Sequence, residues 1–555
     1  MGISKMDGKE TKKKAKDLVT EFADDATAHG FGLIKRSGNK YSKILAIAVV
    51  LTCATFAVKN IWEQIKRYYD YHYIDTISIE ERAIEMPSVS ICTALPYPMT
   101  IVFQEDIILR APSLYRYASL TSYGYLLKNL LETSVSDFKL QDGYDYIFEN
   151  VLFSQQMGNA HVPDQEMAYL FHNINNLVIQ CRFAGKPCNS SFFTEFRHPS
   201  FGRCFTFNGA GLKMDQDMTI RSTDPKSGLH FKVFLDGYKP IPFPNGMFYD
   251  NKDPLGGIVG LHVTIHQPGS VPFPIEDGFE IPPGYATYVT LKRKKRTRLG
   301  KPWNSCEDQL FLNGTDFAYT KAGCVSQCYQ EKIMHMCGCV SYDFIIPKNN
   351  TMVFCEHLDL DNMFKLIQRQ YGSRNLGNIS ILLQDLDKLK CLVNIKNMRL
   401  PCTECLPPCV ETDYEHVQSQ AYWPGDMTLG YFARSIYERS DIDLNENNAW
   451  KFIETHIINY TTLAAKEFQI SNITQSAMMH KNFASLIVYF KEMTTEVTKQ
   501  EADYNVSQLI CDIGGALGIY IGASLISLYE LGKLLVDLCH IVLHRNKNQV
   551  EEIKT

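Results

Sequence analysis

Two apolar runs, one near each end of the chain, constrain the fold most strongly. The first covers Ile44 to Val58 between two lysines, and the second covers Ile513 to Tyr529 between two carboxylates. A helix rises 1.5 Å per residue, so the second run covers roughly 25 Å, close to the thickness of the hydrocarbon core of a bilayer. Trp62 extends the shorter first run into the membrane interface. We therefore predict two transmembrane helices, over 44–62 and 505–543.

The second predicted helix has an unusual content of small residues. Glycine recurs at every fourth position, which leaves one helix face as bare backbone: Gly514, Gly518 and Gly522. The Gly-Ala-Ser segment at 522–524 suits a narrow constriction lined by carbonyls and a hydroxyl, and tight helix packing without a pore is the alternative. A continuous helix over 506–542 would be about 55 Å long, too long to cross upright, so it must tilt, protrude or break.

Two spans place both termini on one side of the membrane and about 440 residues on the other. The first run starts too far from Met1, and lacks the cleavage site, for a signal peptide. Fourteen of the seventeen cysteines lie in the middle segment: Cys92, Cys181, Cys188, Cys204, Cys306, Cys324, Cys328, Cys337, Cys339, Cys355, Cys391, Cys402, Cys405 and Cys409. An even, clustered set of this kind predicts seven disulfides in an extracellular domain.

N-glycosylation sequons support the same topology, because they also fall in the middle segment: Asn189, Asn313, Asn349, Asn378, Asn459 and Asn472, with Asn505 at its end. We therefore expect a multi-pass plasma-membrane protein with cytoplasmic segments at 1–43 and 544–555 and an extracellular domain at 63–504. Zinc is the alternative for the close cysteine spacings between Cys324 and Cys409, but it fits a reducing compartment better.

The composition and motifs exclude several function classes. The net charge of −5 does not indicate a nucleic-acid partner. The chain has no nucleophile elbow, phosphate loop or metalloprotease helix, so we predict neither an enzyme nor a bound cofactor or metal.

The middle segment mixes strand and helix patterns, which predicts an α+β domain. Strand patterns cover 85–92, 261–266, 285–291 and 486–490, the last followed by a polar segment. Alternation at 261–266 predicts one buried and one exposed strand face. Helical patterns are found at 126–131, 361–371 and 379–392.

A basic run follows the third of these strands. Six of the seven residues from Lys292 to Arg298 are Lys or Arg. We interpret this run as a solvated strand end or turn, and a proprotein-convertase site at 293–296 is the alternative.

Several motifs of this sequence resemble those of the epithelial sodium channel/degenerin superfamily. They are D-I-G-G-x-x-G-x-x-I-G-A-S-x-x-x-x-x-E at 512–530, LIVYFKEM at 486–493, MPSVSIC at 86–92, GRCFTFN at 202–208, and His29-Gly30. The order of the fourteen cysteines is similar too. The resemblance covers nearly the whole chain.

The resemblance implies a homotrimeric, sodium-selective cation channel, blocked by amiloride and embedded in membrane lipid. Its extracellular domain has a β-sheet palm, a knuckle, a helical finger and a thumb, with the thumb at about 306–409. The implied disulfides are Cys92–Cys204, Cys181–Cys188, Cys306–Cys409, Cys324–Cys405, Cys328–Cys402, Cys337–Cys391 and Cys339–Cys355.

The resemblance also assigns the pore residues. Gly522, Ala523 and Ser524 form the selectivity filter and interrupt the second helix. Pore and gate positions are Cys511, Asp512, Gly515 and Glu530. Three copies of the two carboxylates make rings of negative charge that concentrate cations at the pore mouths.

Two further features of the resemblance concern gating. His29-Gly30 forms a re-entrant loop below the filter. Trp303 presses on an aromatic ring above the first span, either Tyr71 or Tyr73, and this contact transmits the state of the extracellular domain to the gate.

The stimulus that opens the channel is less directly encoded. Acid-sensing relatives carry a His pair above the first span, and this chain has only His72 there, although Asp359 and Asp361 are candidate proton sensors. The segment 544–555 has no proline-rich motif of the epithelial branch. We therefore expect an FMRFamide-type channel that binds an amidated neuropeptide. Proton gating, and a cell-surface receptor that conducts nothing, are the alternatives.

Overall fold

The structure, a computed structural model, describes residues 13–14, 16–18, 20–21, 38–102, 110, 112–113, 124–134, 146–151, 159–211, 218–237, 258–370, 377–398, 400–438, 447–457, 459–462, 465–467, 473–522, 524, 529–530 and 532–540. Four predicted site residues lie outside this set: His29, Gly30, Ala523 and Asn472. The chain divides into two compact units. One comprises 1–76, 299–304 and 500–555, and the other comprises 77–298 and 305–499.

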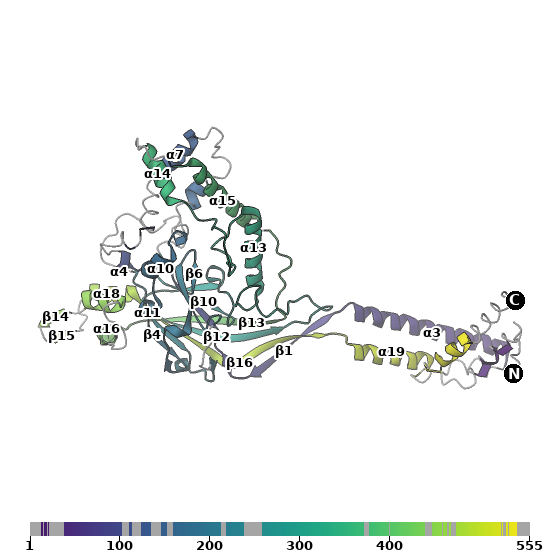
Figure 1. The fold of residues 1–555 in the computed structure, drawn as a ribbon. Helices are drawn as coiled ribbons and strands as arrows, with labels where there is room; N and C mark the ends of the chain where they lie inside the picture. Colours follow the sequence, from purple (N-terminus) through teal and green to yellow (C-terminus); the bar gives the residue numbers. More distant parts are fainter. Residues whose placement is uncertain are drawn as a thin grey trace, which may run out of the picture. The chain divides into compact units, whose positions relative to one another are not determined.

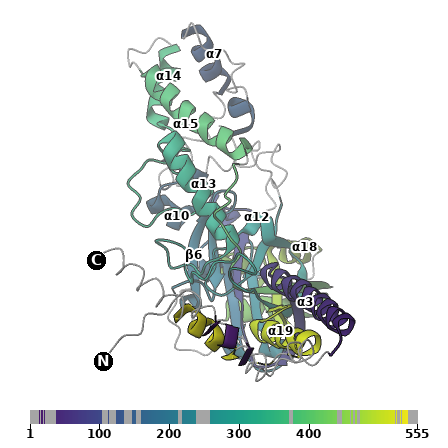
Figure 2. The same cartoon turned by 90° about the vertical axis from the view of Figure 1, so that its right-hand side faces the viewer.

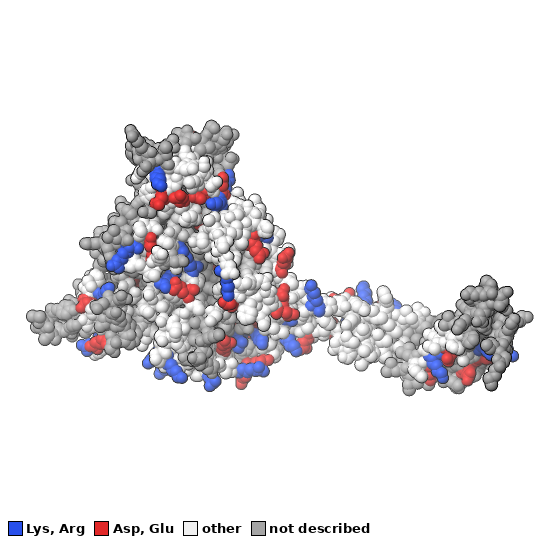
Figure 3. All heavy atoms as spheres, in the orientation of Figure 1, with Lys and Arg blue, Asp and Glu red and all other residues white. Residues whose placement is uncertain are grey.

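The first unit contains two helices that pack side by side, α3 (Lys40–Tyr69) and α19 (Val506–Ile521). No proline or glycine interrupts the chain after the first apolar run, so α3 continues beyond the predicted 44–62, and Lys59 and Glu63 form an i,i+4 ion pair at 3.9 Å. Among the described residues, α3 alone is long and apolar enough to cross a membrane unaided, and α19 is a shorter apolar helix. Figure 3 shows few charged side chains along this pair.

The second unit is built on a seven-stranded sheet of order β13-β12-β16-β9-β4-β5, with β1 paired to β16 (Figure 1). The strands are β1 (Tyr73–Glu81), β4 (Val178–Phe183), β5 (Lys186–Pro187), β9 (Leu229–Phe234), β12 (Tyr285–Thr297), β13 (Val410–Tyr422) and β16 (Phe483–Ala502). β16 is much longer than the predicted 486–490. Its second half, MTTEVTKQEA, is rich in β-branched residues, so the segment expected as a polar connection is strand.

A five-stranded antiparallel sheet, of order β11-β10-β3-β7-β6, packs against the first sheet. Its strands are β3 (Ser88–Thr93), β6 (Phe193–His198), β7 (Gly202–Phe207), β10 (Leu261–His266) and β11 (Gly278–Ile281). One apolar core joins both sheets through residues such as Ile91, Phe207 and Val263 from the smaller sheet and Phe231, Val289 and Val488 from the larger.

The prediction of one exposed face for the strand at 261–266 was wrong. His262 and Thr264 are buried like Leu261 and Val263. His262 Nε2 donates a hydrogen bond to the Pro274 carbonyl, its Nδ1 is hydrogen-bonded to the Glu280 carboxylate, and its ring stacks on Phe201. Burial of His262 is thus matched by partners, whereas the buried Thr264 hydroxyl has no hydrogen-bond partner among the described residues.

The basic run forms the end of β12, in agreement with the prediction of a strand end or turn. Arg293 to Arg296 lie within β12, which pairs with β13 on one side and with β16 on the other. Lys292 and Lys294 lie near acidic residues of these neighbours, with Nζ–Oε distances of 2.9 Å to Glu496 and 2.5 Å to Glu415. The charges therefore pair across the sheet.

A helical layer stands apart from the sheets within the second unit (Figure 2). It consists of α7 (Gly124–Ser134), α13 (Lys321–Cys337), α14 (Leu360–Gln370) and α15 (Ile379–Met398), with a π-helical turn η2 (Ile147–Val151). Leucines at helical spacing on α15, among them Leu382, Leu386 and Leu389, form a separate apolar core with α7 and α14. The described residues of the three segments predicted from periodicity are therefore helical.

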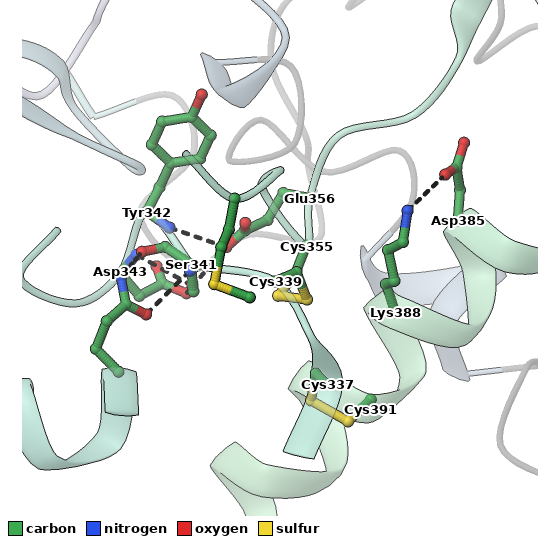
Figure 4. Close-up of a disulfide and its surroundings, with 12 residues drawn as sticks. Cys337, Cys339, Ser341, Tyr342, Asp343, Cys355, Glu356, Asp385, Lys388 and Cys391 are labelled. Carbon is green, nitrogen blue, oxygen red and sulfur yellow. Dashed lines mark hydrogen bonds and ion pairs between the residues drawn. A yellow bond between two sulfur atoms is a disulfide. The ribbon is translucent and has the colours of Figure 1, made fainter. Parts of the chain in front are cut away.

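Seven disulfides are present: Cys92–Cys204, Cys181–Cys188, Cys306–Cys409, Cys324–Cys405, Cys328–Cys402, Cys337–Cys391 and Cys339–Cys355. These are the pairs that the resemblance implies. The last five join segments within 306–409, so this helical layer is cross-linked along its length. Figure 4 shows two of them beside Glu356, whose carboxylate accepts hydrogen bonds from Ser341 and Tyr342.

The remaining elements of the second unit are short. Three helices pack on the ends of β9 and β16: α16 (Leu429–Tyr437), α17 (Asn448–His456) and α18 (Ile473–Asn482). The others are β2 (Ile84–Glu85), α4 (Met99–Val102), α10 (Asp164–Leu170), α11 (Ile174–Leu177), η3 (Ser190–Phe192), β8 (Thr219–Ile220), η4 (Pro225–Ser227), α12 (Pro274–Asp277), η5 (Asp426–Thr428), β14 (Asn459–Thr462) and β15 (Ala465–Glu467).

Candidate pore and gate-coupling site

Small residues mark the contact between the two helices of the first unit. The buried residues of α3 are Ala46 and Ala57, and that of α19 is Ala516. The rings of Phe56 and Tyr520 stack across the pair at 6.4 Å. Alanine at the contact lets the two backbones approach closely, as helices do in membranes.

The glycines of α19 take no part in this packing. A Cβ placed on Gly514, Gly515 or Gly518 would meet no described atom within 4 Å. Ile519 is 83% exposed on the same helix. The interpretation of the glycine repeat as a seam for packing within one chain is thus not supported by the described residues, and this face is open to lipid, water or another chain.

Gly522 ends α19. Its backbone is left-handed, with φ of +67°, and its N–H donates to the Gly518 carbonyl at 3.1 Å. This conformation is costly for residues with a Cβ and suits glycine at a helix end. Ser524 is not helical, and helical backbone is present again at 529–530 and 532–540. The helix break that the resemblance implies therefore falls at the predicted filter.

Asp512 is tied to the residue pair that precedes α19. The Tyr504 hydroxyl donates to Asp512 Oδ2 at 2.7 Å. Partial burial, and then this hydrogen bond, raise the pKa of Tyr504 to about 12, so the phenol stays a donor at neutral pH. The carboxylate is thereby held near the start of α19.

A cation from α3 completes this network. Arg67 Nη2 lies 3.0 Å from Asp503 Oδ2, and the Arg67 guanidinium stacks over the Tyr504 ring at 5.0 Å. The Asp503 N–H donates to the His72 carbonyl at 3.0 Å. These contacts fasten the end of the first helix to the start of the second.

The Trp303 ring contacts Tyr71 edge to face at 5.7 Å. Tyr71 has a positive φ of 49°, uncommon for a residue with a side chain, and its ring also contacts Tyr68 and Tyr69. Of the two tyrosines that the resemblance offered, Tyr71 makes the contact. Tyr73 is 42% exposed at the start of β1.

Gln500 anchors the loop that carries Trp303. Its buried Oε1 accepts hydrogen bonds from the Leu299 N–H at 3.2 Å and from Asn304 Nδ2 at 3.0 Å, one on each side of the tryptophan. Gln500 lies near the end of β16, two residues before that strand stops. The loop position is therefore linked directly to the strand that leads into α19.

Sequence reasoning missed the residues that hold this arrangement together: Arg67, Gln500, Asp503 and Tyr504. Each is polar and lies within a few residues of a predicted span, where the sequence offers many similar side chains. A cation–π pair and a side-chain amide that hydrogen-bonds both ends of a loop have no spacing signature in the sequence. Their partners are at least 196 residues apart in the chain.

Other predicted site residues have structural roles or stay as predictions. Asp359 accepts a hydrogen bond from the Asn362 N–H at 2.9 Å and so caps the start of α14.

The sequon side chains of Asn189, Asn313, Asn349 and Asn378 are exposed, which is compatible with glycan attachment. The one cluster of potential metal ligands among the described residues, Cys306, Asp308 and Cys409, has both sulfurs in a disulfide.

A family model for the amiloride-sensitive sodium channel matches residues 22–534, nearly the whole chain. The chain belongs to the amiloride-sensitive sodium channel family. It therefore belongs to a family of plasma-membrane channels that carry sodium, and the expectation that it is no enzyme agrees with this membership.

The names of similar proteins give different activating stimuli. The FMRFamide-activated amiloride-sensitive sodium channel of Cornu aspersum is 24% identical, over 96% of this chain and 85% of its own. The bile acid-sensitive ion channel of Mus musculus is 23% identical, over 93% and 87%. The epithelial sodium channel subunit alpha of Neoceratodus forsteri is 22% identical, over 96% and 82%. Because these matches cover nearly all of this chain and most of each relative, the similarity extends over the whole chain and is not limited to one domain.

Proposed function

We propose that this chain forms a homotrimeric, amiloride-sensitive sodium channel opened by an extracellular amidated neuropeptide such as FMRFamide. The observation that carries the peptide stimulus is the match to the FMRFamide-activated channel, which spans 96% of this chain. The bile acid-sensitive relative is nearly as similar, so identity alone does not separate these two stimuli and both belong in the test.

In this proposal the second span lines the pore. Gly522, Ala523 and Ser524 supply the filter, where three copies offer carbonyl oxygens in place of the water shell of sodium. Asp512 and Glu530 form carboxylate rings at the two mouths, and Cys511 and Gly515 line the gate. His29-Gly30 forms the re-entrant loop on the cytoplasmic side, where both termini lie.

The contact between Trp303 and Tyr71 connects the stimulus to the gate. The loop that carries Trp303 follows β12 and is bracketed by Gln500 of β16. Movement of either strand thus reaches the end of α3 through an aromatic contact and the start of α19 through the chain itself. Tyr71 follows α3, and its ring passes the contact on to Tyr68 and Tyr69 at the end of that helix.

Three buried histidines are unsuited to sensing mild acid. Burial lowers the pKa of His172 to about 3 and that of His198 and His266 to about 4. Below the ordinary pKa near 6.5 the unfolded chain gains these protons and the folded chain does not, so acid destabilises the fold between about pH 6.5 and 4. These groups stay neutral at the mild acidity that opens an acid sensor.

Expression in oocytes tests the proposal. FMRFamide and related amidated peptides should evoke an inward sodium current that amiloride blocks, and a bath at pH 6 or a bile acid alone should not. Water-injected oocytes control for endogenous channels. A current evoked by acid alone would assign proton gating instead, and silence under every stimulus, with the protein detected at the surface, would contradict the conducting role itself.

A further inference from the structure

A cavity of about 690 Å³ lies at the junction of four elements of the second unit, outside the pore and the coupling site. Its walls come from the end of β10 and the following loop, from α12, from the start of α13 and from the start of β13. This volume lies within the range of sites that hold small organic molecules. Phe273, Tyr414 and His416 give it aromatic surface, and Val271 and Val325 give it aliphatic surface.

The charged groups of the cavity are unevenly paired. Of its three acidic residues, Glu411 is neutralised by Arg298, whose Nη2 lies 2.5 Å away. The carboxylates of Asp277 and Asp413 form no hydrogen bond or ion pair with the described residues. Lys321 is the one lysine or arginine among the lining residues, and it is exposed, as are Asp277 and Asp413. Two acidic groups at the cavity are therefore without a cation close enough to pair.

The surroundings of these two carboxylates favour an added positive charge. Partial burial raises the pKa of Asp277, and partial burial followed by the nearby Glu411 raises the pKa of Asp413, although Arg296 and Arg298 act on Asp413 in the opposite direction. Burial lowers the pKa of His416, and lowers that of His266 to about 4, so neither imidazole supplies a cation at neutral pH. A bound cation would stabilise both carboxylates in the ionised form.

A bare metal ion does not fit this arrangement. Asp277, Asp413 and His416 do not bring their donor atoms within 4.8 Å of one another, since they are absent from the clusters that do so among the described residues. His266 already uses both ring nitrogens, toward Ser90 and Ser270. Among the described residues no third protein donor therefore joins the two carboxylates to complete a metal site, and an organic cation, which needs no further protein ligand, fits better.

We propose that this cavity binds a small aromatic amine, with its ammonium group between Asp277 and Asp413 and its ring against Phe273 and Tyr414. The ammonium donates charge-assisted hydrogen bonds to both carboxylates. The aromatic side chains bury the ring of the ligand and add a cation–π contribution.

Titration calorimetry on the detergent-solubilised full-length chain tests this site, with 2-phenylethylamine as the probe. The neutral analogue 2-phenylethanol has the same shape without the charge, so it should bind at least fivefold more weakly. Asp277→Asn and Asp413→Asn should each weaken binding of the amine about three- to tenfold. Lys321→Gln removes the like charge and should tighten it by up to about threefold.

The opposite signs of these changes separate charge recognition from general damage to the fold. Each variant is also melted without ligand, and equal melting temperatures show an intact chain. Failure of the amine to bind at millimolar concentration would overturn the proposal. So would equal binding of the amine and the alcohol, or amine binding that none of the three substitutions changes.

A peptide that begins with phenylalanine carries the same ammonium and ring, so a competition arm identifies the source of the ligand. Displacement of 2-phenylethylamine by FMRFamide, but not by its N-acetylated form, would assign the site to a peptide terminus, and no displacement would assign it to a free amine. The measurement records no current, so its failure leaves the proposed peptide gating untouched.

Discussion

Glu356 shows how one buried carboxylate makes the stability of the disulfide-rich layer depend on pH. Burial, and then the nearby Asp343 carboxylate, raise the pKa of Glu356, and its Oε2 has no hydrogen-bond partner among the described residues. For a carboxyl group whose pKa is raised by folding, burying the protonated form costs less free energy than burying the ionised form. The stability that protonation provides is present at low pH and is lost as the pH rises through the folded pKa.

Glu356→Gln should therefore stabilise the protein at pH 8 by about 1 kcal/mol, because an uncharged amide replaces a buried charge. The difference should disappear near pH 4, where the glutamate is protonated in both states. Thermal melting at the two pH values with the disulfides intact measures this. The exposed Glu404→Gln, from the same cross-linked segment, should show no such pH-dependent difference. A larger gain at pH 4 than at pH 8 would contradict the argument.

Cys511 offers a chemical test of the pore lining. It is free and exposed on α19, one residue before Asp512. If this position lines the gate, a cationic methanethiosulfonate reagent applied outside should change the current by several fold only when the channel is open.

The other free cysteines make the control. Cys511→Ser should abolish the effect of the reagent, although Cys53 and Cys539 are still present. Modification at equal rates in open and closed channels would place Cys511 outside the gate, and no modification in either state would remove it from the pore lining.

At the scale of elements, the loop 299–304 and the end of α3 should act as one unit through Trp303 and Tyr71. An aromatic pair of this geometry contributes about 1 kcal/mol beyond area burial, or roughly a fivefold change in an equilibrium constant. Trp303→Leu and Tyr71→Leu should each shift the half-activating peptide concentration. If the two changes were independent, the double variant would show the product of the two fold-shifts. We expect its shift to be about fivefold smaller than that product.

Tyr73→Leu is the matched control for this cycle, because Tyr73 is two residues away and makes no described ring contact with Trp303. It should leave the half-activating concentration within about twofold of the wild type. Additive effects of Trp303→Leu and Tyr71→Leu would show that the ring contact carries no coupling.

The strand β12 gives a second prediction at this scale. A convertase needs an extended, unpaired segment, whereas the backbone of Arg293 to Arg296 is hydrogen-bonded to β13 and β16. Surface-labelled protein should run at full mass on a reducing gel, even with a proprotein convertase co-expressed, and Arg296→Gln should leave the pattern unchanged. Two fragments would mean that this part of the sheet opens in the cell.

These elements also show what the sequence could predict. The spacing of apolar residues located α14, α15 and the central part of β16, because each of these elements buries a regular series of apolar side chains. The full length of β16 was missed, since charged residues alternate with β-branched ones there and the charges pair with a neighbouring strand. The buried face of β10 was misjudged because His262 finds Glu280 and Pro274, which sequence spacing cannot reveal. Within the site, motif-bearing residues were predicted, and the long-range contacts of Arg67 and Gln500 were not.

At the scale of the whole molecule, the open glycine face of α19 bears on assembly. Gly518→Ala adds a methyl group that meets no described atom within 4 Å in the single chain, and alanine favours a helix over glycine by about 1 kcal/mol. The single chain should therefore tolerate the change or gain stability. In the proposed trimer, with α19 as the proposed pore-lining helix, a stripe of glycines would face other copies or the ion path, where added methyl groups would obstruct packing or permeation.

We therefore expect Gly518→Ala to reduce the peptide-evoked current at least tenfold with normal surface expression. Gly532→Ala, at another helical glycine with the same free space, should have less effect. Native mass measurement in detergent then separates the two causes, because an intact trimer has three times the mass of one 63.3 kDa chain. Loss of the trimer would indicate subunit packing, and an intact trimer with reduced current would indicate the ion path. Wild-type current and assembly would show that this face meets only lipid, and would move the pore to another surface of the helix pair.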